Sequence, residues 1–146
     1  MKIGICNDHR GYYLKNVLVA FLEEKGYEVV DFGTNSEESV DFPDFAFKLG
    51  DAIVDGQVER GIAICGTGIG MSIALNKISG VICGKISNVS EAMFCRSHNN
   101  ANCIAMSEDI DDELAKDMVI KFVQTPFSNI EKYVRRNKKI RDRDNG

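Results

Sequence analysis

The fold can be inferred most directly from the segment Gly61-Ile-Ala-Ile-Cys-Gly-Thr-Gly-Ile-Gly-Met71. An apolar run of strand length, Gly61 to Cys65, leads into a glycine-rich turn, Gly66 to Gly70. Met71 to Ile78 follows with the spacing of a short apolar helix. A buried strand that passes through a glycine turn into a helix is typical of a parallel βα unit. Parallel sheets bind ligands at the carboxyl ends of their strands, so the turn is a candidate site.

The same alternation of short apolar runs and helical periods continues on both sides of this stretch. We predict strands over Lys2–Cys6, Tyr27–Phe32, Gly61–Cys65, Val81–Lys85 and Asn102–Met106. Helices are predicted over Gly11–Lys25, within Asp41–Glu59 after Pro43, and over Met71–Ile78, Asn88–Ser97, Asp111–Gln124 and Ser128–Ile140. This pattern predicts an α/β fold: a single-domain, Rossmann-like three-layer sandwich with a five-stranded parallel sheet and a C-terminal helix. The 146 residues form one domain, 1–146, and the tail from about 141 to 146 is expected to fray.

Composition excludes several classes of protein. Lysine and arginine number 18 against 22 aspartate and glutamate, so neither a nucleic-acid partner nor a membrane-binding polybasic patch is expected. Five cysteines at irregular spacing do not form a disulfide framework and suit a reducing cytosol. The apolar run Ile3 to Cys6 is too short for a signal peptide, and Ile62 to Leu75 is too short to span a bilayer. We therefore expect a cytoplasmic protein.

The glycine turn after Cys65 carries the strongest chemical signal. Glycines allow backbone N–H groups to converge on an anion, and a helix N-terminus favours the reactive thiolate form of a neighbouring cysteine. The structural alternative is a simple turn beside a buried cysteine. Three glycines between Gly66 and Gly70 weaken a helix start without structural gain, which favours the functional interpretation.

Three known motifs come close to this turn and fail. A dinucleotide fingerprint requires glycine at position 71, which is Met71. A P-loop requires a terminal Gly-Lys-Ser/Thr, which is absent. A tyrosine-phosphatase loop, C-x5-R-S/T, requires an arginine where Met71-Ser72 stands, so phosphomonoester hydrolysis by Cys65 is not expected.

Both histidines of the chain lie in polar loops. Asp8 and His9 follow the first strand, and His98 precedes the fifth. Lone loop histidines are usually exposed and idle, but two that flank strands of one crevice are candidates for acid–base chemistry. Cys6-x-x-His9 and Cys95-x-x-His98 contain zinc-ligand types. Because Cys6 falls inside a strand and Cys95 inside a helix, we expect no metal.

The segment Lys132 to Arg143 is strongly basic. It places Lys132 and Arg136 one helical turn apart, where the pair can hold a phosphate. A solvated helix face explains the same charges equally well, and the residues alone leave the choice open.

Five motifs together resemble ribose-5-phosphate isomerase type B, in the order found in that family. The resemblance runs from about Lys2 to Ile140. The wider family includes galactose-6-phosphate and allose-6-phosphate isomerases. The motifs are Asn7-Asp-His-Arg-Gly11, Asp31-Phe-Gly-Thr34, Asp41-Phe-Pro-Asp-Phe-Ala46, Gly61 to Lys77, and His98-Asn-Asn-Ala-Asn102.

The resemblance implies a cofactor-free aldose–ketose isomerase that acts on a sugar phosphate through a cis-enediolate. Cys65 would be the base that moves a proton between C1 and C2, and His98 would open the sugar ring. Thr67 would hydrogen-bond the reacting oxygens, and Asp8 would bind or shuttle a hydroxyl proton. The enediolate oxygen would be stabilised by donors from the turn and from one amide side chain: Gly66, Gly68, Gly70 and Asn99.

The family also implies how the substrate is held and how the chain assembles. His9 and Arg136 would bind the phosphate, with Lys132 where the first of two C-terminal arginines is common. Family members are homodimers or dimers of dimers, and each active site lies across a subunit interface.

Three positions depart from the family pattern. Phe42 replaces a common tyrosine, Lys132 replaces an arginine, and Asp109 stands where an arginine often reaches the phosphate of the neighbouring subunit. Arg10 is uncommon after the histidine, and we expect it to compensate as a phosphate ligand. The alternative is that Arg10 is solvated or pairs with an acidic neighbour.

Two other functions stay open. The first is isomerisation of a hexose 6-phosphate, because spacing does not reveal pocket volume. The second is a non-catalytic sugar-phosphate-binding subunit. Asp109 favours this second function weakly, whereas the joint presence of Cys65, Thr67, Asp8 and His98 argues against it.

Overall fold

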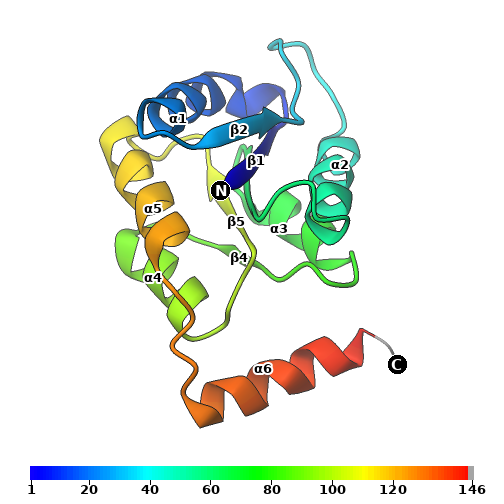
Figure 1. Ribbon diagram of the computed structural model, residues 1–146. Coiled ribbons are helices and arrows are strands. Elements are labelled where there is room, and N and C mark those ends of the chain that lie inside the picture. Colours follow the sequence, from blue (N-terminus) through cyan, green and yellow to red (C-terminus); the bar gives the residue numbers. More distant parts are fainter. Residues whose placement is uncertain (145–146) are drawn as a thin grey trace.

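The sheet of the computed structural model, which describes residues 1–144, has five parallel strands in the order β2-β1-β3-β5-β4 (Figure 1). The strands are β1 (Lys2–Asn7), β2 (Glu28–Asp31), β3 (Arg60–Cys65), β4 (Cys83–Lys85) and β5 (Cys103–Ser107). From β1 the chain first adds β2 on one side and then places β3, β5 and β4 on the other. The order therefore reverses between β1 and β3, and this is the switch point at which open α/β sheets bind ligands.

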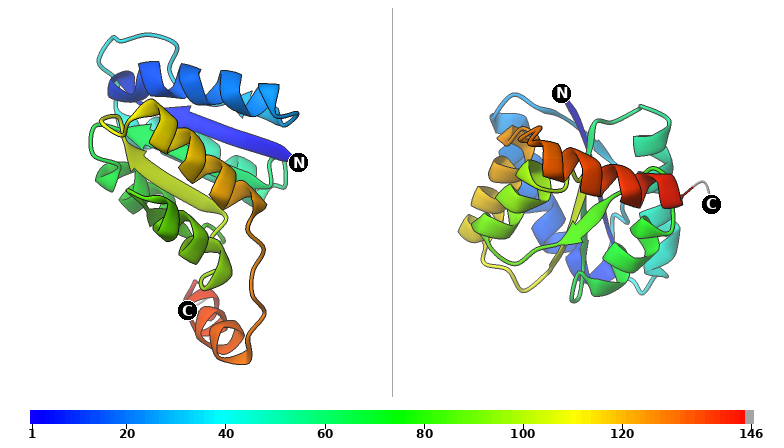
Figure 2. Two further views of the ribbon diagram at one scale, coloured as in Figure 1. Left: turned by 90° about the vertical axis from the view of Figure 1, so that its left-hand side faces the viewer. Right: turned by 90° about the horizontal axis from the view of Figure 1, so that it is seen from below.

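Helices cover both faces of the sheet, which confirms the predicted three-layer α/β fold. One face carries α1 (Tyr12–Glu24), α4 (Val89–Ser97) and α5 (Asp112–Gln124), and a 3₁₀ turn, η1 (His9–Gly11), precedes α1. The other face carries α2 (Phe42–Val54) and α3 (Ile69–Asn76). The last helix, α6 (Glu131–Arg143), lies outside the sandwich beside the end of α4 (Figures 1 and 2). Within residues 1–144 no helix combines the length and apolarity needed to cross a bilayer.

Side chains of different size occupy the two faces. Successive strand residues point to opposite faces, so Ile62 and Ile64 of β3 pack under α1, α4 and α5, whereas Ala63 and Cys65 face α2 and α3. Gly61 lies on the same face as Ala63 and Cys65 and has no side chain there. A Cβ at Gly61 would lie 2.7 Å from the Cδ1 atom of Ile53. As a result α2 packs directly on the backbone of the sheet, and Cys65 points towards the side from which α3 begins.

A fully buried lysine fixes the segment that follows β2. The Lys15 ammonium forms an ion pair with Asp31 at 2.7 Å and donates to the carbonyl of Thr34 at 3.2 Å and to the side chain of Asn35 at 3.1 Å. A buried charge is tolerated only when it is paired and hydrogen-bonded, as it is here. The contacts tie the segment from Asp31 to Asn35 to α1, next to the carboxyl end of β1.

The boundaries of α6 differ from the prediction of Ser128 to Ile140. Asn129 has a φ of 58°, a left-handed conformation that a helix cannot contain, so the helix begins at Glu131. At the other end Arg141 donates to the carbonyl of Asn100 at 3.0 Å, and the Asp144 carboxylate accepts from the backbone N–H of Gly80 at 3.1 Å. Residues 141–143, where we expect the tail to begin to fray, form the last turn of α6. Residues 145–146 of the predicted tail lie outside the described residues.

Candidate active site

The carboxyl ends of β1 and β3 bring one group of predicted residues together. In the register of these strands Asn7 lies opposite Ile64, and the backbone N–H of Asp8 donates to the carbonyl of Ile64 at 3.2 Å. Asp8 therefore lies beside Cys65, at the switch point of the sheet. We call the residues gathered there the switch-point cluster: Asp8, His9, Arg10, Cys65, Gly66, Thr67, Gly68 and Gly70.

The sulfur of Cys65 is held by the turn that follows it. The backbone N–H of Gly68 donates to the Cys65 sulfur at 3.1 Å, and the N–H of Ile69 donates to the Thr67 hydroxyl at 3.1 Å. Gly68 has a φ of 83°, and an added Cβ would lie 2.8 Å from the carbonyl carbon of Met106. Only glycine fits at this position. The sulfur thus receives an N–H donor from the turn that leads into α3.

Three other thiols are held in the protonated form. Burial raises the pKa of Cys6 and of Cys103 well above the ordinary value. Burial also raises the pKa of Cys95 to about 11. Because only the thiolate is a strong base or nucleophile, these three cysteines are poor candidates for chemistry at neutral pH.

Asp8 and His9 are fixed by backbone groups. One carboxylate oxygen of Asp8 accepts from the N–H groups of Arg10 at 2.9 Å and Gly11 at 3.2 Å, which caps η1. The Nδ1 atom of His9 accepts from the N–H of Val40 at 3.2 Å. A neutral His9 with this contact carries its proton on Nε2, so that Nε2 is a donor for an anion.

Arg10 pairs with Glu108 in this structure. Its Nε atom donates to the Glu108 carboxylate at 2.9 Å, and this contact raises the pKa of Arg10. The pair lies beside Cys65, because the N–H of Glu108 donates to the carbonyl of Cys65 at 2.9 Å. The Arg10 guanidinium carbon would lie 3.9 Å from a Cβ at Gly66. The acidic neighbour considered for Arg10 is thus present, and the guanidinium still borders the turn.

Phe42 covers the first turn of α3. A Cβ at Gly70 would lie 2.8 Å from the Cζ atom of Phe42, so the ring sits directly on this glycine. Gly70 belongs to α3 rather than to the preceding turn, because the helix begins at Ile69. The departure at Phe42 therefore falls at the edge of the switch-point cluster.

A second group of predicted residues surrounds the end of α4. The His98 ring stacks between Phe94, with ring centroids 4.8 Å apart, and Tyr133 of α6, at 4.4 Å. Asn137 of α6 is buried and donates to the carbonyl of His98 at 2.7 Å, and it accepts from the Asn99 side chain at 3.2 Å. We call this group the α4–α6 cluster: His98, Asn99, Lys132, Tyr133, Arg136 and Asn137.

The two clusters lie at opposite ends of the strands: the switch-point cluster at their carboxyl ends and the α4–α6 cluster at their amino ends. In the register of β3 and β5, Cys65 pairs with Ser107 at one end, whereas Gly61 pairs with Cys103 at the other. His98 precedes Cys103 and therefore belongs to the amino-terminal edge. Within a single chain, therefore, His9 and His98 do not flank the same crevice. The reason is topological, because α4 carries the chain back to the edge from which β5 must start.

Sequence reasoning missed two residues of the α4–α6 cluster, Tyr133 and Asn137, and it missed Glu108, the partner of Arg10 in the switch-point cluster. Tyr133 and Asn137 are four residues apart on the helix that carries Lys132 and Arg136, and this spacing marks a common helix face. Their partner, however, is His98, which no local pattern connects to them. Within the described part of the chain, no group of three or more His, Cys, Asp or Glu side chains could hold a metal ion.

The fold and the switch-point cluster define the class of protein. A Rossmann-like sheet that places a thiol, a carboxylate and an imidazole at its switch point belongs to an enzyme of small-molecule acid–base chemistry. More particularly, the chain belongs to the ribose/galactose isomerase family, whose model matches residues 3–140. The resemblance seen in the sequence is thereby confirmed, and the reaction class is aldose–ketose isomerisation.

Similar proteins support this assignment along most of the chain. Ribose-5-phosphate isomerase B of Escherichia coli is 44% identical over 119 residues, which cover 81% of this chain and 80% of the relative. D-erythrulose-4-phosphate isomerase of Pectobacterium atrosepticum is 36% identical over 87% of this chain and 85% of the relative. The structure of Clostridium thermocellum ribose-5-phosphate isomerase B superposes with a TM-score of 0.96 at 43% identity, covering 99% of this chain and 98% of that chain.

Proposed function

We propose that this chain interconverts ribose 5-phosphate and ribulose 5-phosphate through a cis-enediolate. The observation that carries the proposal is the Cys65 sulfur, which accepts from the N–H of Gly68 beside Asp8 at the switch point. The relatives named ribose-5-phosphate isomerase B support this choice of sugar phosphate.

In this mechanism the Cys65 thiolate removes the proton on C2 of the open aldose and returns it to C1. The electron pair of the broken C–H bond forms the C1–C2 double bond, and the carbonyl oxygen becomes the enediolate oxygen. N–H groups of the turn, with Asn99, donate to that oxygen. Thr67 hydrogen-bonds the reacting oxygens, and Asp8 passes the hydroxyl proton between them. His98 opens the furanose ring before this step.

The separation of the two clusters supports a site built from two copies of the chain. His98 and Asn99 of one copy would face Cys65 of the other, in a homodimer or a dimer of dimers. Exposed apolar side chains border both clusters: Ile69 and Ile73 beside the turn, and Ile130 and Val134 on α6. Apolar side chains left exposed in this way are typical of a surface that another protein covers.

The phosphate of the substrate would be held by His9 of one copy together with Lys132 and Arg136 of the other. Arg136 is exposed on α6 and forms no ion pair among residues 1–144. Arg10 would join these donors by exchanging the Glu108 carboxylate for the phosphate. An exposed ion pair contributes little to stability, so a dianion can compete for the guanidinium.

An assay with three substrates tests the proposal. Purified protein is given ribose 5-phosphate, allose 6-phosphate or galactose 6-phosphate, and formation of the ketose is followed in a coupled assay. We expect the highest kcat/KM with ribose 5-phosphate. A higher value with a hexose 6-phosphate would assign the alternative substrate. Binding of all three without turnover would assign the non-catalytic subunit.

A further inference from the structure

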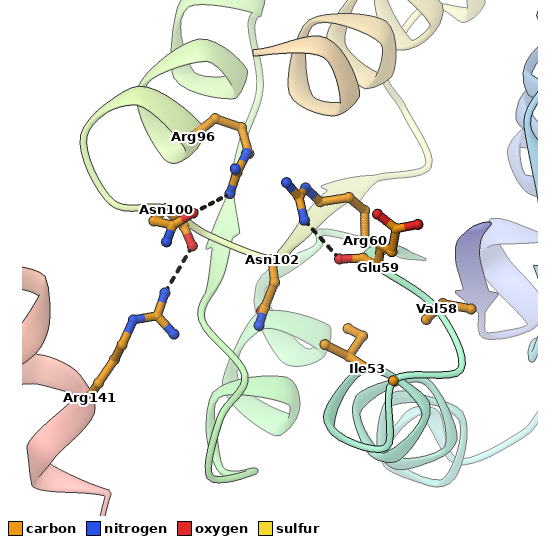
Figure 3. Close-up of a pocket in the computed structure, with 9 residues that line it drawn as sticks. Ile53, Val58, Glu59, Arg60, Arg96, Asn100, Asn102 and Arg141 are labelled. Atoms are coloured by element: carbon orange, nitrogen blue, oxygen red, sulfur yellow. Dashed lines mark hydrogen bonds between the residues drawn. The ribbon is translucent and has the colours of Figure 1, made fainter. Parts of the chain in front are cut away.

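A cavity lies far from the switch point, at the end of the sheet where the strands begin. It has a volume of about 390 Å³ and lies between the end of α2, the start of β3, the end of α4 and α6 (Figure 3). Three arginines from three different elements line it: Arg60 of β3, Arg96 of α4 and Arg141 of α6. Glu59 is the one acidic side chain among its lining residues.

Backbone carbonyls fix the three guanidinium groups without neutralising them. Arg96 donates to the carbonyls of Ala101 at 2.7 Å and Thr125 at 3.1 Å. Arg60 donates to the carbonyl of Glu59 at 3.0 Å, and Arg141 to that of Asn100 at 3.0 Å. None of the three arginines forms an ion pair with a carboxylate among residues 1–144. The three arginines and Glu59 therefore leave the cavity with an excess of positive charge among the described residues.

Donor capacity also remains unused at this cavity. The Nε atom of Arg60 is buried and has no hydrogen-bond partner in the described part of the chain. Figure 3 shows the guanidinium groups of Arg60 and Arg96 pointing towards each other. A buried donor without a partner is costly and needs an explanation, and a bound acceptor would supply one.

The positive charges of the three guanidinium groups repel one another. Burial, together with the like charges of Arg60 and Arg141, lowers the pKa of Arg96 to about 10. Burial also lowers the pKa of Arg60, against the opposing effect of Glu59. An anion between these groups would relieve the repulsion and return each guanidinium to its ordinary range.

We propose that this cavity binds a small phosphorylated polyanion at a site separate from the substrate site. Guanidinium forks match the geometry of phosphate oxygens, and three of them converge on a volume suited to a small ligand. The cations predicted for the substrate phosphate, Lys132 and Arg136, do not line the cavity. The proposal is thus independent of the isomerase function, and the two can fail separately.

Calorimetric titration with inorganic pyrophosphate at fixed ionic strength tests the site. Arg60→Gln and Arg141→Gln should each weaken binding about tenfold or more, because each removes a charge-assisted contact. Arg143→Gln is the matched control, since it removes the same charge from the same helix turn but from a residue that does not line the cavity. Arg136→Gln removes a cation of the substrate site. Both of these variants should keep the affinity of the wild type.

Several results would overturn the proposal. The protein could fail to bind pyrophosphate, or binding could be lost only in Arg136→Gln. The affinity could also decrease equally in Arg143→Gln, and this result would mean diffuse attraction rather than a site. Arg60→Gln could also change the oligomer in sedimentation while leaving pyrophosphate binding intact, which would mean that a carboxylate of another copy fills the cavity. Arg141 is only half-buried on α6, so Arg141→Gln keeps the test valid if Arg60→Gln folds poorly.

Discussion

At the scale of single residues, the sulfur of Cys65 differs from the other thiols in its hydrogen-bond donor. Gly68 supplies that donor from a backbone position which only glycine can occupy, so the geometry does not depend on a mobile side chain. The half-buried Cys95, by contrast, has a pKa of about 11 and remains protonated at neutral pH. The two residues form a natural pair for substitution.

We predict that Cys65→Ser lowers kcat by roughly 10²–10⁴-fold, the usual contribution of a general base, while substrate still binds. A hydroxyl is far harder to ionise than a thiol, but its smaller atom leaves the turn intact. Steady-state kinetics and a binding titration measure the two effects, and Cys95→Ser should change neither. Near-normal turnover by Cys65→Ser would assign the base to another residue.

Substitutions of Arg10 and Glu108 test which residues bind the substrate phosphate. If Arg10 leaves Glu108 for the substrate, Arg136→Ala and Arg10→Ala should each raise KM by roughly one to two orders of magnitude. Glu108→Gln should lower KM, because it removes the competing carboxylate. KM values measured for the three variants decide the matter. An unchanged KM in Arg10→Ala, beside a large rise in Arg136→Ala, would leave Arg10 as a partner of Glu108 only.

At the scale of elements, α6 positions His98, the residue that we propose opens the sugar ring. Tyr133 stacks on the His98 ring and Asn137 donates to the His98 backbone carbonyl, so the helix holds both the ring and the backbone of this residue. We predict that Tyr133→Ala lowers kcat on cyclic ribose 5-phosphate by roughly tenfold to a hundredfold, as expected when a catalytic group is misplaced. Tyr133→Phe keeps the stacking and should retain activity.

The substrate used in that assay separates positioning from general damage. Like His98→Asn, Tyr133→Ala should harm turnover of the cyclic sugar more than turnover of a substrate supplied already open, because in the proposed mechanism proton transfer by Cys65 follows ring opening. Equal losses on both substrates would mean that α6 supports only stability, and a urea unfolding curve would then show a matching decrease in the midpoint.

The sequence predicts those elements whose pattern is local. The runs Lys2–Cys6 and Gly61–Cys65 and the turn to Gly70 could be recognised because periodicity and glycine content act over a few residues. The docking of α6 could not, because it depends on contacts of Tyr133 and Asn137 with residues distant in the chain. The position of His98 before the fifth strand could be predicted, but not how it reaches the crevice at Cys65. Strand order and direction, not residue type, decide the end of the sheet to which a loop belongs.

At the scale of the whole molecule, complete activity requires two chains if each site combines opposite edges of the sheet. We predict that mixing inactive Cys65→Ser protein with inactive His98→Asn protein restores about a quarter of wild-type activity after exchange of subunits, because random pairing gives half mixed dimers with one intact site each. The mixture is assayed after dissociation and reassociation. No recovery, with mixed dimers shown by mass spectrometry, would place the whole site in one chain.

The rate at which Lys15 is chemically modified measures how often the folded protein opens. The Lys15 amine is sealed between α1 and the segment after β2, where it is paired with Asp31. An acylating reagent therefore modifies surface lysines such as Lys138 at once, and reaches Lys15 only during the moments when the packed layers part. Peptide mass spectrometry of Lys15 acylation should give a rate that rises with urea in step with global unfolding. Acylation of Lys15 therefore reports how much time the protein spends in the open state.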